Sequence, residues 1–191
     1  MTPERERKLV PVRRVVTGHD ESGRSTVLSD EFSPHTMTFP GVPDYGQTDL
    51  WRTRVPADNT TSGESCENPT MAPPDGGVVF RVVQIPPDHL FLADFDRTAM
   101  FGGLPDGKHA VGDHEVRNAT MHRTRSVDFA VVLDGEVHAV LEDGEVLLRR
   151  GDTLIQRGTL HGWSNRTDSN CQIAFVLVDA GPSDAGEEQQ P

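Results

Sequence analysis

Four polar residues in the C-terminal half of the chain have the types and the spacing that a reactive centre on a β-sheet requires. They are His122, Thr124, Asp128 and His161. Alternate residues of a strand face the same side, so His122 and Thr124 share a face, and Asp128, four residues on, returns to it. A closed barrel would bring His161 to the same interior. Two imidazoles and a carboxylate are therefore expected to converge there.

Such a group of side chains allows two kinds of chemistry. Imidazole nitrogen and carboxylate oxygen together suit Fe(II), Mn(II), Ni(II), Zn(II) or Cu(II). Without a metal, the same three side chains could do general acid–base work. The residue types alone leave both alternatives open.

Three further polar or aromatic residues are candidates for contact with a substrate. Thr124 shares the face of His122, and Trp163 shares that of His161, where it is first a core residue and then a wall for a planar substrate. Gln156 could bond a substrate oxygen or face solvent, and we include it as a substrate-binding candidate. Asn165 is interpreted as a turn residue and not as a ligand.

Short β-type segments must position these residues. Turn signals separate them at Asp134-Gly135, Asp143-Gly144, Arg150-Gly151-Asp152 and Arg157-Gly158. Strands of about five residues broken by such turns are typical of an antiparallel sandwich or barrel, so the prediction is an all-β fold of one of these two kinds. The expected strands cover about 115–122, 126–133, 136–141, 145–149, 152–156, 159–164 and 171–178.

The length of 191 residues favours one domain with extensions. We expect a disordered N-terminus over 1–10, and N-terminal strands with a mobile loop, packing on the barrel, over 11–76. The barrel itself is expected over 77–180 and a disordered tail over 181–191. Within these segments the expected strands are 11–17, 24–29, 49–55 and 78–85, with a loop over 30–47, a mobile insertion over 56–76 and a short helical turn within 88–101.

Charge and composition limit the partners. The net charge of −12 argues against nucleic acid and against an anionic membrane surface, because phosphate binding needs a basic face. No apolar run approaches the length that spans a membrane, and the N-terminus has no apolar segment typical of a secretion signal. The two cysteines form no disulfide framework, so we expect a cytoplasmic protein. The interior of a barrel of this size holds one small molecule, so we also expect a small-molecule substrate.

The spacing of the polar residues resembles the two motifs of the cupin superfamily. The first motif, G-x5-H-x-H-x(3,4)-E-x6-G, is followed by His122, Thr124, Asp128 and Gly135. The second, G-x5-P-x-G-x2-H-x3-N, is followed by Gly151, Gln156, Gly158, His161 and Asn165, with one residue fewer after Gly151 and Gln in place of Pro. The resemblance covers about residues 78–178 and extends to a group of small single-domain cupins. It implies a double-stranded β-helix, or jelly-roll, barrel.

The resemblance also implies a site. Cupins usually hold a metal with three His and one Glu, and here Thr124 stands in the place of the second His and Asp128 in that of the Glu. His122, Asp128 and His161 are then the expected catalytic residues and the expected ligands of a divalent transition metal, and a metal-free site stays open. Cupins often dimerise by exchanging an N-terminal strand, so we expect a homodimer in which the 11–29 hairpin is exchanged.

Three functions remain open from the sequence. We favour a metal-assisted lyase or isomerase that decarboxylates, dehydrates or cyclises an oxo or hydroxy acid or a polyketide-like substrate. The alternatives are a non-haem Fe(II) dioxygenase and a cupin that binds a small ligand without turnover. His109 and His114 are expected to be surface residues, and Arg123 is expected to point away from the face of His122 into an ion pair or a dimer edge.

Overall fold

The computed structural model describes residues 8–60, 66, 69–102, 104, 107 and 116–180. The helical elements whose bounds lie within this part are two 3-10 turns, η1 (Asp88–Leu90) and η2 (Leu92–Asp94), and one short helix, α1 (Arg97–Gly102). The strands are β1 (Arg13–His19), β2 (Ser25–Phe32), β3 (Thr36–Phe39), β4 (Val42–Arg54), β5 (Gly77–Ile85), β6 (Ser126–Asp134), β7 (Glu136–Leu141), β8 (Glu145–Arg149), β9 (Thr153–Arg157), β10 (His161–Ser164) and β11 (Cys171–Asp179). The all-β prediction is confirmed, and so is a helical turn within 88–101.

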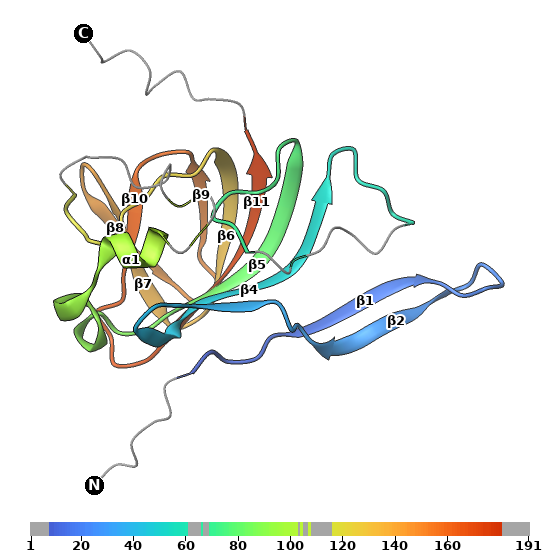
Figure 1. Ribbon diagram of the computed structural model, residues 1–191, viewed down its shortest axis with the longest axis horizontal. Helices are drawn as coiled ribbons and strands as arrows, with labels where there is room; N and C mark the ends of the chain where they lie inside the picture. Colours follow the sequence, from blue (N-terminus) through green and yellow to red (C-terminus); the bar gives the residue numbers. More distant parts are fainter. Residues whose placement is uncertain are drawn as a thin grey trace, which may run out of the picture.

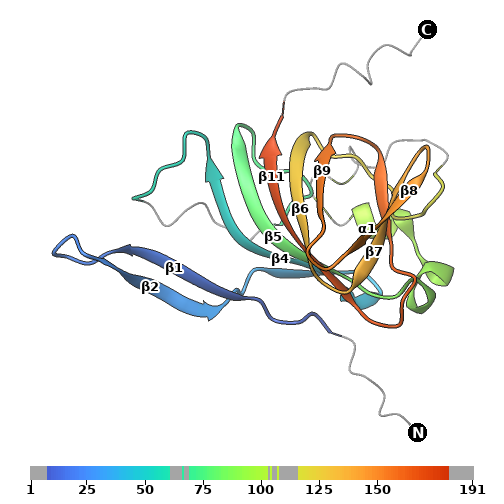
Figure 2. The ribbon, with the colours of Figure 1, turned by 180° about the vertical axis from the view of Figure 1, so that it is seen from behind.

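Two sheets form the body of the molecule. One has six strands in the order β3-β4-β5-β11-β6-β9, and the other has three in the order β10-β7-β8 (Figures 1 and 2). All their pairings are antiparallel. This is a double-sheet barrel, or jelly-roll, one of the two kinds that the turn spacing predicts and the one that the resemblance implies.

The core lies between the two sheets because residues alternate along each strand. On β11, Ile173, Phe175 and Leu177 are buried, while the residues between them are partly exposed. The tight turns let each strand reverse. Gly135, in the turn between β6 and β7, has a φ of 76° and lies against Asn170 and Cys171, so a side chain there would meet both strain and crowding.

The prediction of a loop over 30–47 is wrong. Pro34 precedes β3, Pro40 lies in the turn between β3 and β4, and Pro43 lies at the start of β4, before its ladder with β5 begins at Gly46. Pro40-Gly41 forms the turn, with a φ of 75° at Gly41. Since β3 and β4 belong to the six-stranded sheet, the barrel begins at Thr36 and the boundary expected at residue 77 falls inside it.

The strand predicted over 115–122 is also absent from the described residues 116–122. Asn118 instead makes a turn, because its side-chain oxygen accepts hydrogen bonds from the backbone N–H and the hydroxyl of Thr120. Only His122 pairs with another strand, as an isolated bridge.

Residues 69–76, which we call the strap, were expected to belong to a mobile insertion. In the structure they pack on the barrel: Met71 and Pro73 are buried, and the carbonyl oxygens of Thr70 and Met71 accept hydrogen bonds from Arg81 on β5. Most of the insertion between residues 61 and 68, the 181–191 tail, His109 and His114 lie outside the described residues.

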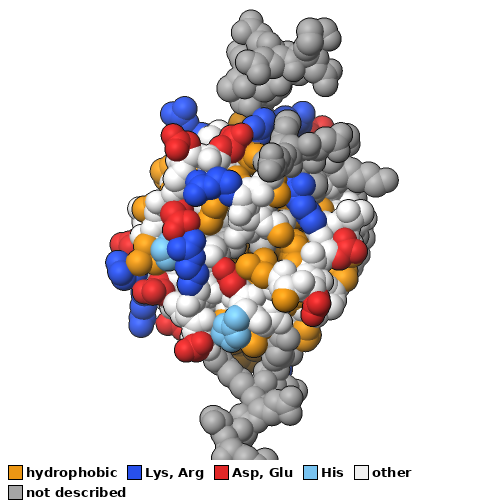
Figure 3. Space-filling view, turned by 90° about the vertical axis from the view of Figure 1, so that its left-hand side faces the viewer, with side chains coloured by type: hydrophobic (Ala, Val, Ile, Leu, Met, Phe, Trp, Pro, Cys, Tyr) orange, Lys and Arg blue, Asp and Glu red, His pale blue; other side chains and the backbone are white. Residues whose placement is uncertain are grey.

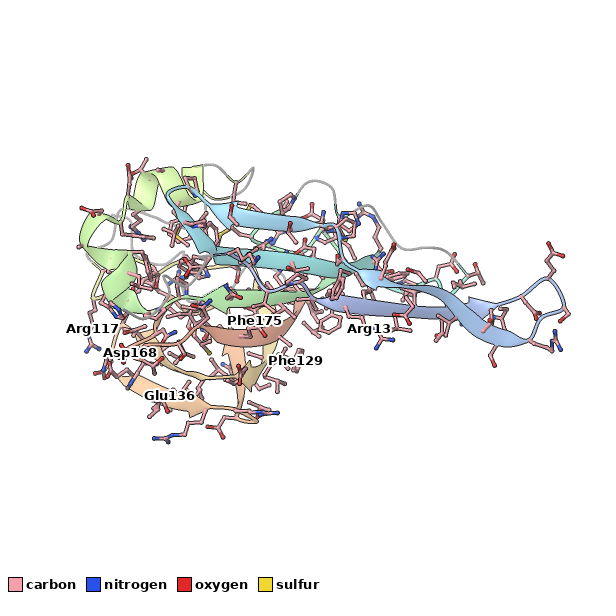
Figure 4. All side chains as sticks on the ribbon, turned by 90° about the horizontal axis from the view of Figure 1, so that it is seen from below. Arg13, Arg117, Phe129, Glu136, Asp168 and Phe175 are labelled. Carbon is pink, nitrogen blue, oxygen red and sulfur yellow. The ribbon has the colours of Figure 1, made fainter. Side chains whose placement is uncertain are left out.

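The strands β1 and β2 form a two-stranded hairpin, here called the arm, which projects away from the barrel in all three ribbon views (Figures 1, 2 and 4). Arg13, at the start of the arm, pairs with Asp30 on its second strand. Several large apolar side chains of the arm are exposed: Val15, Val27, Leu28 and Phe32.

The surface, the helices and the cysteines add three observations. On the face drawn in Figure 3, the coloured acidic and basic side chains are mixed. Within the described part of the chain, no helix has the length and the apolar character needed to cross a membrane. Cys66 and Cys171 are buried free thiols.

Candidate functional site

The centre of the site is a pair of histidines from different segments. The backbone N–H of each histidine donates to the carbonyl of the other, at 2.8 Å and 3.0 Å. This bridge attaches the segment before β6 to strand β10 and places the two imidazole rings side by side, with centroids 4.5 Å apart and planes at 52°. The predicted convergence of His122 and His161 is therefore present.

Each imidazole is fixed in one orientation by a backbone carbonyl. The Nδ1 atom of His122 lies 2.9 Å from the carbonyl oxygen of Thr120, and that of His161 lies 2.9 Å from that of Thr159. A carbonyl only accepts, so Nδ1 carries the proton of each neutral ring. The Nε2 atoms are then left as hydrogen-bond acceptors.

Asp128 on β6 is the third member of the site and is 3 % exposed. Its Oδ1 accepts a hydrogen bond of 2.5 Å from the hydroxyl of Ser126, which in turn lies 2.9 Å from the hydroxyl of Thr124. The alternation of β6 and of the segment before it turns all three side chains inward. A chain of hydroxyls thus leads to one buried carboxylate.

These residues line a space of about 70 Å³, here called the inner cavity. His122, Thr124, Asp128, His161 and Trp163 all contribute to its wall. Met100 and Phe101 of α1 close one side, and the remaining lining residues are Phe39, Tyr45, Gln47, Met71, Arg81, Val83, Phe175 and Leu177. The volume has room for a few water molecules or for the reacting end of a small molecule.

Burial sets the protonation of the site. It lowers the pKa of His161 to about 3, with the neighbouring His122 adding to the shift, and it lowers the pKa of His122 as well. Both imidazoles are neutral at pH 7. Burial raises the pKa of Asp128 to about 6, although hydrogen bonds from Ser126 and Thr124 and the charge of Arg81 act against this rise. The carboxyl can therefore gain or lose a proton near neutral pH.

Arg81 is a functional candidate that the sequence reasoning missed. It lies on β5, is 3 % exposed and lines the inner cavity. Its guanidinium pairs with Asp49 at 3.0 Å and donates to the side-chain oxygen of Gln47 at 3.1 Å. A charged residue within the otherwise apolar segment VVFRVV was the signal that could have revealed it.

The metal centre expected from the sequence can be compared with this geometry. The two imidazoles could serve as metal ligands. Their Nε2 atoms carry no proton and have a free electron pair, and their Nδ1 atoms are held by backbone carbonyls. Among the described residues, however, no three His, Cys, Asp or Glu side chains form a group that could hold a metal ion. The three-ligand set of His122, Asp128 and His161 is thus not assembled in this structure, and it stays a prediction.

Comparison with known proteins finds relatives that match either a third of this chain or most of it. No protein-family model matches the chain. The "Phomopsin biosynthesis cluster protein D" of Diaporthe leptostromiformis is 50% identical over 64 residues, which are 32% of this chain and 34% of that protein. The "Cupin-domain-containing oxidoreductase fogC" of Aspergillus ruber is 28% identical over 172 residues, which are 88% of this chain and 72% of that protein.

Over most of its length the chain is therefore similar to a protein named for its cupin domain. The chain spans only about a third (34%) of the length of the phomopsin-cluster protein that it matches. The solved structure of a cupin 2 conserved barrel domain protein from Salinispora arenicola is also similar to this chain. The alignment covers 72% of this chain and 77% of that protein's chain, with 15% identity and a TM-score of 0.37.

Four further residues singled out in the sequence, Thr124, Trp163, Gln156 and Asn165, occupy different places in the structure. Thr124 and Trp163 line the inner cavity, and the Trp163 ring meets that of His161 edge-on at 5.7 Å. Gln156 does not belong to the lining, and its side-chain amide donates to the hydroxyl of Thr159. Asn165 is a turn residue, as interpreted from the sequence, because its side chain donates to the carbonyls of Ile85 and Ser169.

The raised pKa of Asp128 predicts a pH-dependent cost to stability. The folded pKa of about 6 exceeds the ordinary unfolded value of about 4, so the folded state binds more protons between these values and stability falls as pH rises through this window. Asp128→Asn removes the ionisation. Relative to the unaltered protein, the variant should gain about 1–3 kcal/mol in free energy of unfolding between pH 4 and pH 7.5. Urea denaturation at both pH values measures this difference.

The matched control is Asp168→Asn, since Asp168 is exposed. Its effect on the free energy of unfolding should be the same at both pH values. If Asp128→Asn also shows no change with pH, the carboxyl of Asp128 does not titrate as its burial requires.

Proposed function

We propose that this protein is a cupin enzyme that moves a proton within a small oxo or hydroxy acid, in an isomerisation or a lyase reaction. One observation carries the proposal. A buried carboxyl of pKa about 6 and two neutral imidazoles, whose Nε2 atoms carry no proton, line the same cavity. Perturbed titratable groups gathered in a cavity are a mark of catalytic sites.

In the proposed step, the Asp128 carboxylate removes the proton from the carbon next to a carbonyl, and the electron pair moves onto the carbonyl oxygen. In an isomerisation, a hydroxyl on the reacting carbon passes its proton to the former carbonyl oxygen, and Asp128 returns its own proton to the former carbonyl carbon. In a dehydration, the electron pair forms a new double bond to the next carbon, and Asp128 gives the proton to the hydroxide that departs from that carbon. No cosubstrate is consumed in either case. The Nε2 atoms of His122 and His161 accept hydrogen bonds from substrate hydroxyls and so orient the carbon that reacts.

The negative charge that develops on the substrate oxygen needs a positive charge nearby. The guanidinium of Arg81 lines the same cavity and is held in place by Asp49 and Gln47. A charge that is already oriented needs no rearrangement during the reaction, which is the usual source of electrostatic stabilisation in enzymes.

Proton exchange gives a test that does not require the natural substrate. Small oxo acids are incubated in D2O with the protein, and NMR follows deuterium incorporation next to the carbonyl. The rate should rise about tenfold per pH unit up to about pH 6 and then stay constant, because only ionised Asp128 accepts a proton. Asp128→Asn should lose at least about 100-fold, as removal of a general base does, and His161→Ala should abolish the exchange without unfolding the protein.

Asp168→Asn serves again as the control and should exchange at the unaltered rate. Full exchange activity in Asp128→Asn would contradict the proposal. Saturable binding of the acids without any exchange by the unaltered protein would contradict it as well, and would favour a cupin that only binds its ligand.

A redox reaction is the second candidate, because several relatives, fogC among them, are named cupin-domain-containing oxidoreductases. The Fe(II) dioxygenase expected as an alternative from the sequence belongs to this class. Among the described residues, His122, Asp128 and His161 do not form a group that could hold a metal ion, so this set of iron ligands stays a prediction from the sequence.

Elemental analysis and oxygen uptake separate the two candidates. We expect deuterium exchange to continue at an unchanged rate after chelation and under anaerobic conditions. Stoichiometric iron in the purified protein, together with oxygen uptake on addition of an acid, would favour the oxidoreductase and overturn the proton-transfer proposal.

We also propose that the protein partner is a second copy of this chain. The outer face of the six-stranded sheet carries an apolar row that crosses five strands in register: Trp51, Phe80, Val176, Phe129 and Ile155. Phe129 is 47 % exposed and lies outside the barrel (Figure 4). A patch of this kind is typical of an interface.

The arm supplies the matching surface. A two-stranded hairpin is marginally stable alone, and this one exposes Leu28 by 61 % and Phe32 by 63 %. Two copies related by a two-fold axis would each cover the partner's sheet with an arm. Burial of these side chains by a second copy would offset the cost of exposing them.

Light scattering at micromolar concentration tests this partner. The unaltered protein should be a dimer, and the double variant Leu28→Ser/Phe32→Ser should be a monomer, because the apolar contacts of the arm are removed. Val146→Ser, at an exposed valine on the three-stranded sheet, should stay dimeric. A monomeric unaltered protein would contradict the proposal.

A further inference from the structure

A larger cleft of about 720 Å³ lies beside the inner cavity, at the rim of the barrel where β4, β9 and β11 end and β6 begins. The ends of β4 and β11 point to this rim at the top of Figure 1. We call it the rim cleft. The strap forms one of its walls, and the residues around the start of β6 and the end of β9 form another.

The rim cleft and the inner cavity share wall residues. Thr124 and Met71 line both spaces. Ser126 lines the rim cleft and donates its hydrogen bond to Asp128, which lines the inner cavity. A molecule in the rim cleft would therefore lie next to the proposed reactive centre.

The charges of the rim cleft are unusual for this chain. Its lining contains four arginines and two aspartates, although the net charge of the chain is −12. Two of the arginines are neutralised: Arg52 pairs with Asp49 at 3.1 Å, and Arg125 pairs with Asp75 at 2.6 Å and with Asp179 at 3.5 Å. Both aspartates of the lining, Asp75 and Asp179, are therefore already paired with Arg125.

The other two arginines, Arg123 and Arg157, have no ion-pair partner among the residues that the structure describes. The Nε atom of Arg123 is buried without a hydrogen-bond acceptor. Of the two roles expected for Arg123, the ion pair is not present among the described residues, and the dimer edge stays a prediction. A guanidinium without an opposite charge nearby can gain a charge-assisted hydrogen bond from a bound anion.

We propose that the rim cleft binds the carboxylate end of the substrate through Arg123 and Arg157. The proposal rests on the proposed function, because it takes the inner cavity to hold the reacting end. The volumes fit this division: the rim cleft is within the range of small-molecule sites, whereas the inner cavity holds only a few atoms. Guanidinium groups bind carboxylates in preference to neutral groups of the same shape. The substrate class is then an elongated acid whose carboxylate is remote from the carbon that reacts.

Binding of a matched pair of probes tests the rim cleft without any assay of turnover. The probes are 4-phenylbutyrate and 4-phenylbutyramide, which have similar shapes and differ in charge, and calorimetry measures their dissociation constants. The unaltered protein should bind the acid at least about tenfold more tightly than the amide, as one charge-assisted pair allows. This preference should fall to less than about twofold in Arg123→Gln/Arg157→Gln.

Arg157→Gln alone guards against a folding artefact, since Arg157 is exposed, and it should reduce the preference partially. Arg150→Gln removes an equal charge from an exposed turn outside the rim cleft and should leave the preference unchanged. Equal binding of acid and amide by the unaltered protein, or an equal loss in Arg150→Gln, would overturn the proposal.

The same experiment keeps the two proposals distinguishable. Asp128→Asn should still prefer the acid probe, because the rim arginines are intact, even though it is expected to lose proton exchange. If Asp128→Asn exchanges protons normally while the acid preference persists, the proton-transfer proposal fails and the rim cleft stands. If exchange depends on Asp128 but acid and amide bind equally, only the rim cleft fails.

Discussion

The site depends on one short antiparallel bridge. Two backbone hydrogen bonds between His122 and His161 attach a segment without regular strand structure to β10. Because the bridge pairs the two histidines directly, it also sets the distance between their rings. The carbonyls of Thr120 and Thr159, each two residues earlier in the chain, then fix the two rings in the same way. The backbone determines both the position and the tautomer of the imidazoles.

The polar groups around this bridge are buried at a cost that the fold has to offset. Asp49 is fully buried and pairs with both Arg52 and Arg81, while Asp128 lies close enough to Arg81 for its charge to matter. Replacing a buried ion network of this kind with apolar residues often leaves a protein as stable or more stable. Stability alone therefore does not explain the network. Its effect is to hold one guanidinium and the strap carbonyls of Thr70 and Met71 at the wall of the cavity.

The sequence is informative about the barrel where local chemistry decides the structure. The turns at Gly135, Gly144, Gly151 and Gly158 all have positive φ, the conformation in which glycine is favoured, and the strands between them lie close to their predicted positions. The prediction failed where the local sequence is compatible with two different backbone structures. The prolines before β4 fit a loop as well as a hairpin, and only pairing with β5 decides between them. His122 was found by its spacing, although the strand expected to carry it does not exist.

Residues whose role depends on tertiary contacts could not be predicted in the same way. Gln156 occupies a motif position, but a hydrogen bond to Thr159 holds its side chain outside the cavity lining. Arg81 carries no motif, and its function becomes visible only when β4, β5 and the strap meet. Pattern reasoning assigns a residue to a face of a strand. It does not say which of the side chains on that face reach the empty space.

The distribution of arginines gives the last step of this argument. A chain with 30 acidic and 18 basic residues has enough carboxylates to pair every guanidinium. It pairs those of the arm, the inner network and the β8 side, where Arg13, Arg81 and Arg166 each meet an acid within 3.0 Å. Among the described residues, Arg123 and Arg157 have no such ion-pair partner, and both line the cleft beside the inner cavity. Arg150 also lacks an ion pair there, but it lies in an exposed turn outside that cleft. What distinguishes Arg123 and Arg157 is that they share the wall of a space large enough for a molecule, where a bound anion would complete the pairing.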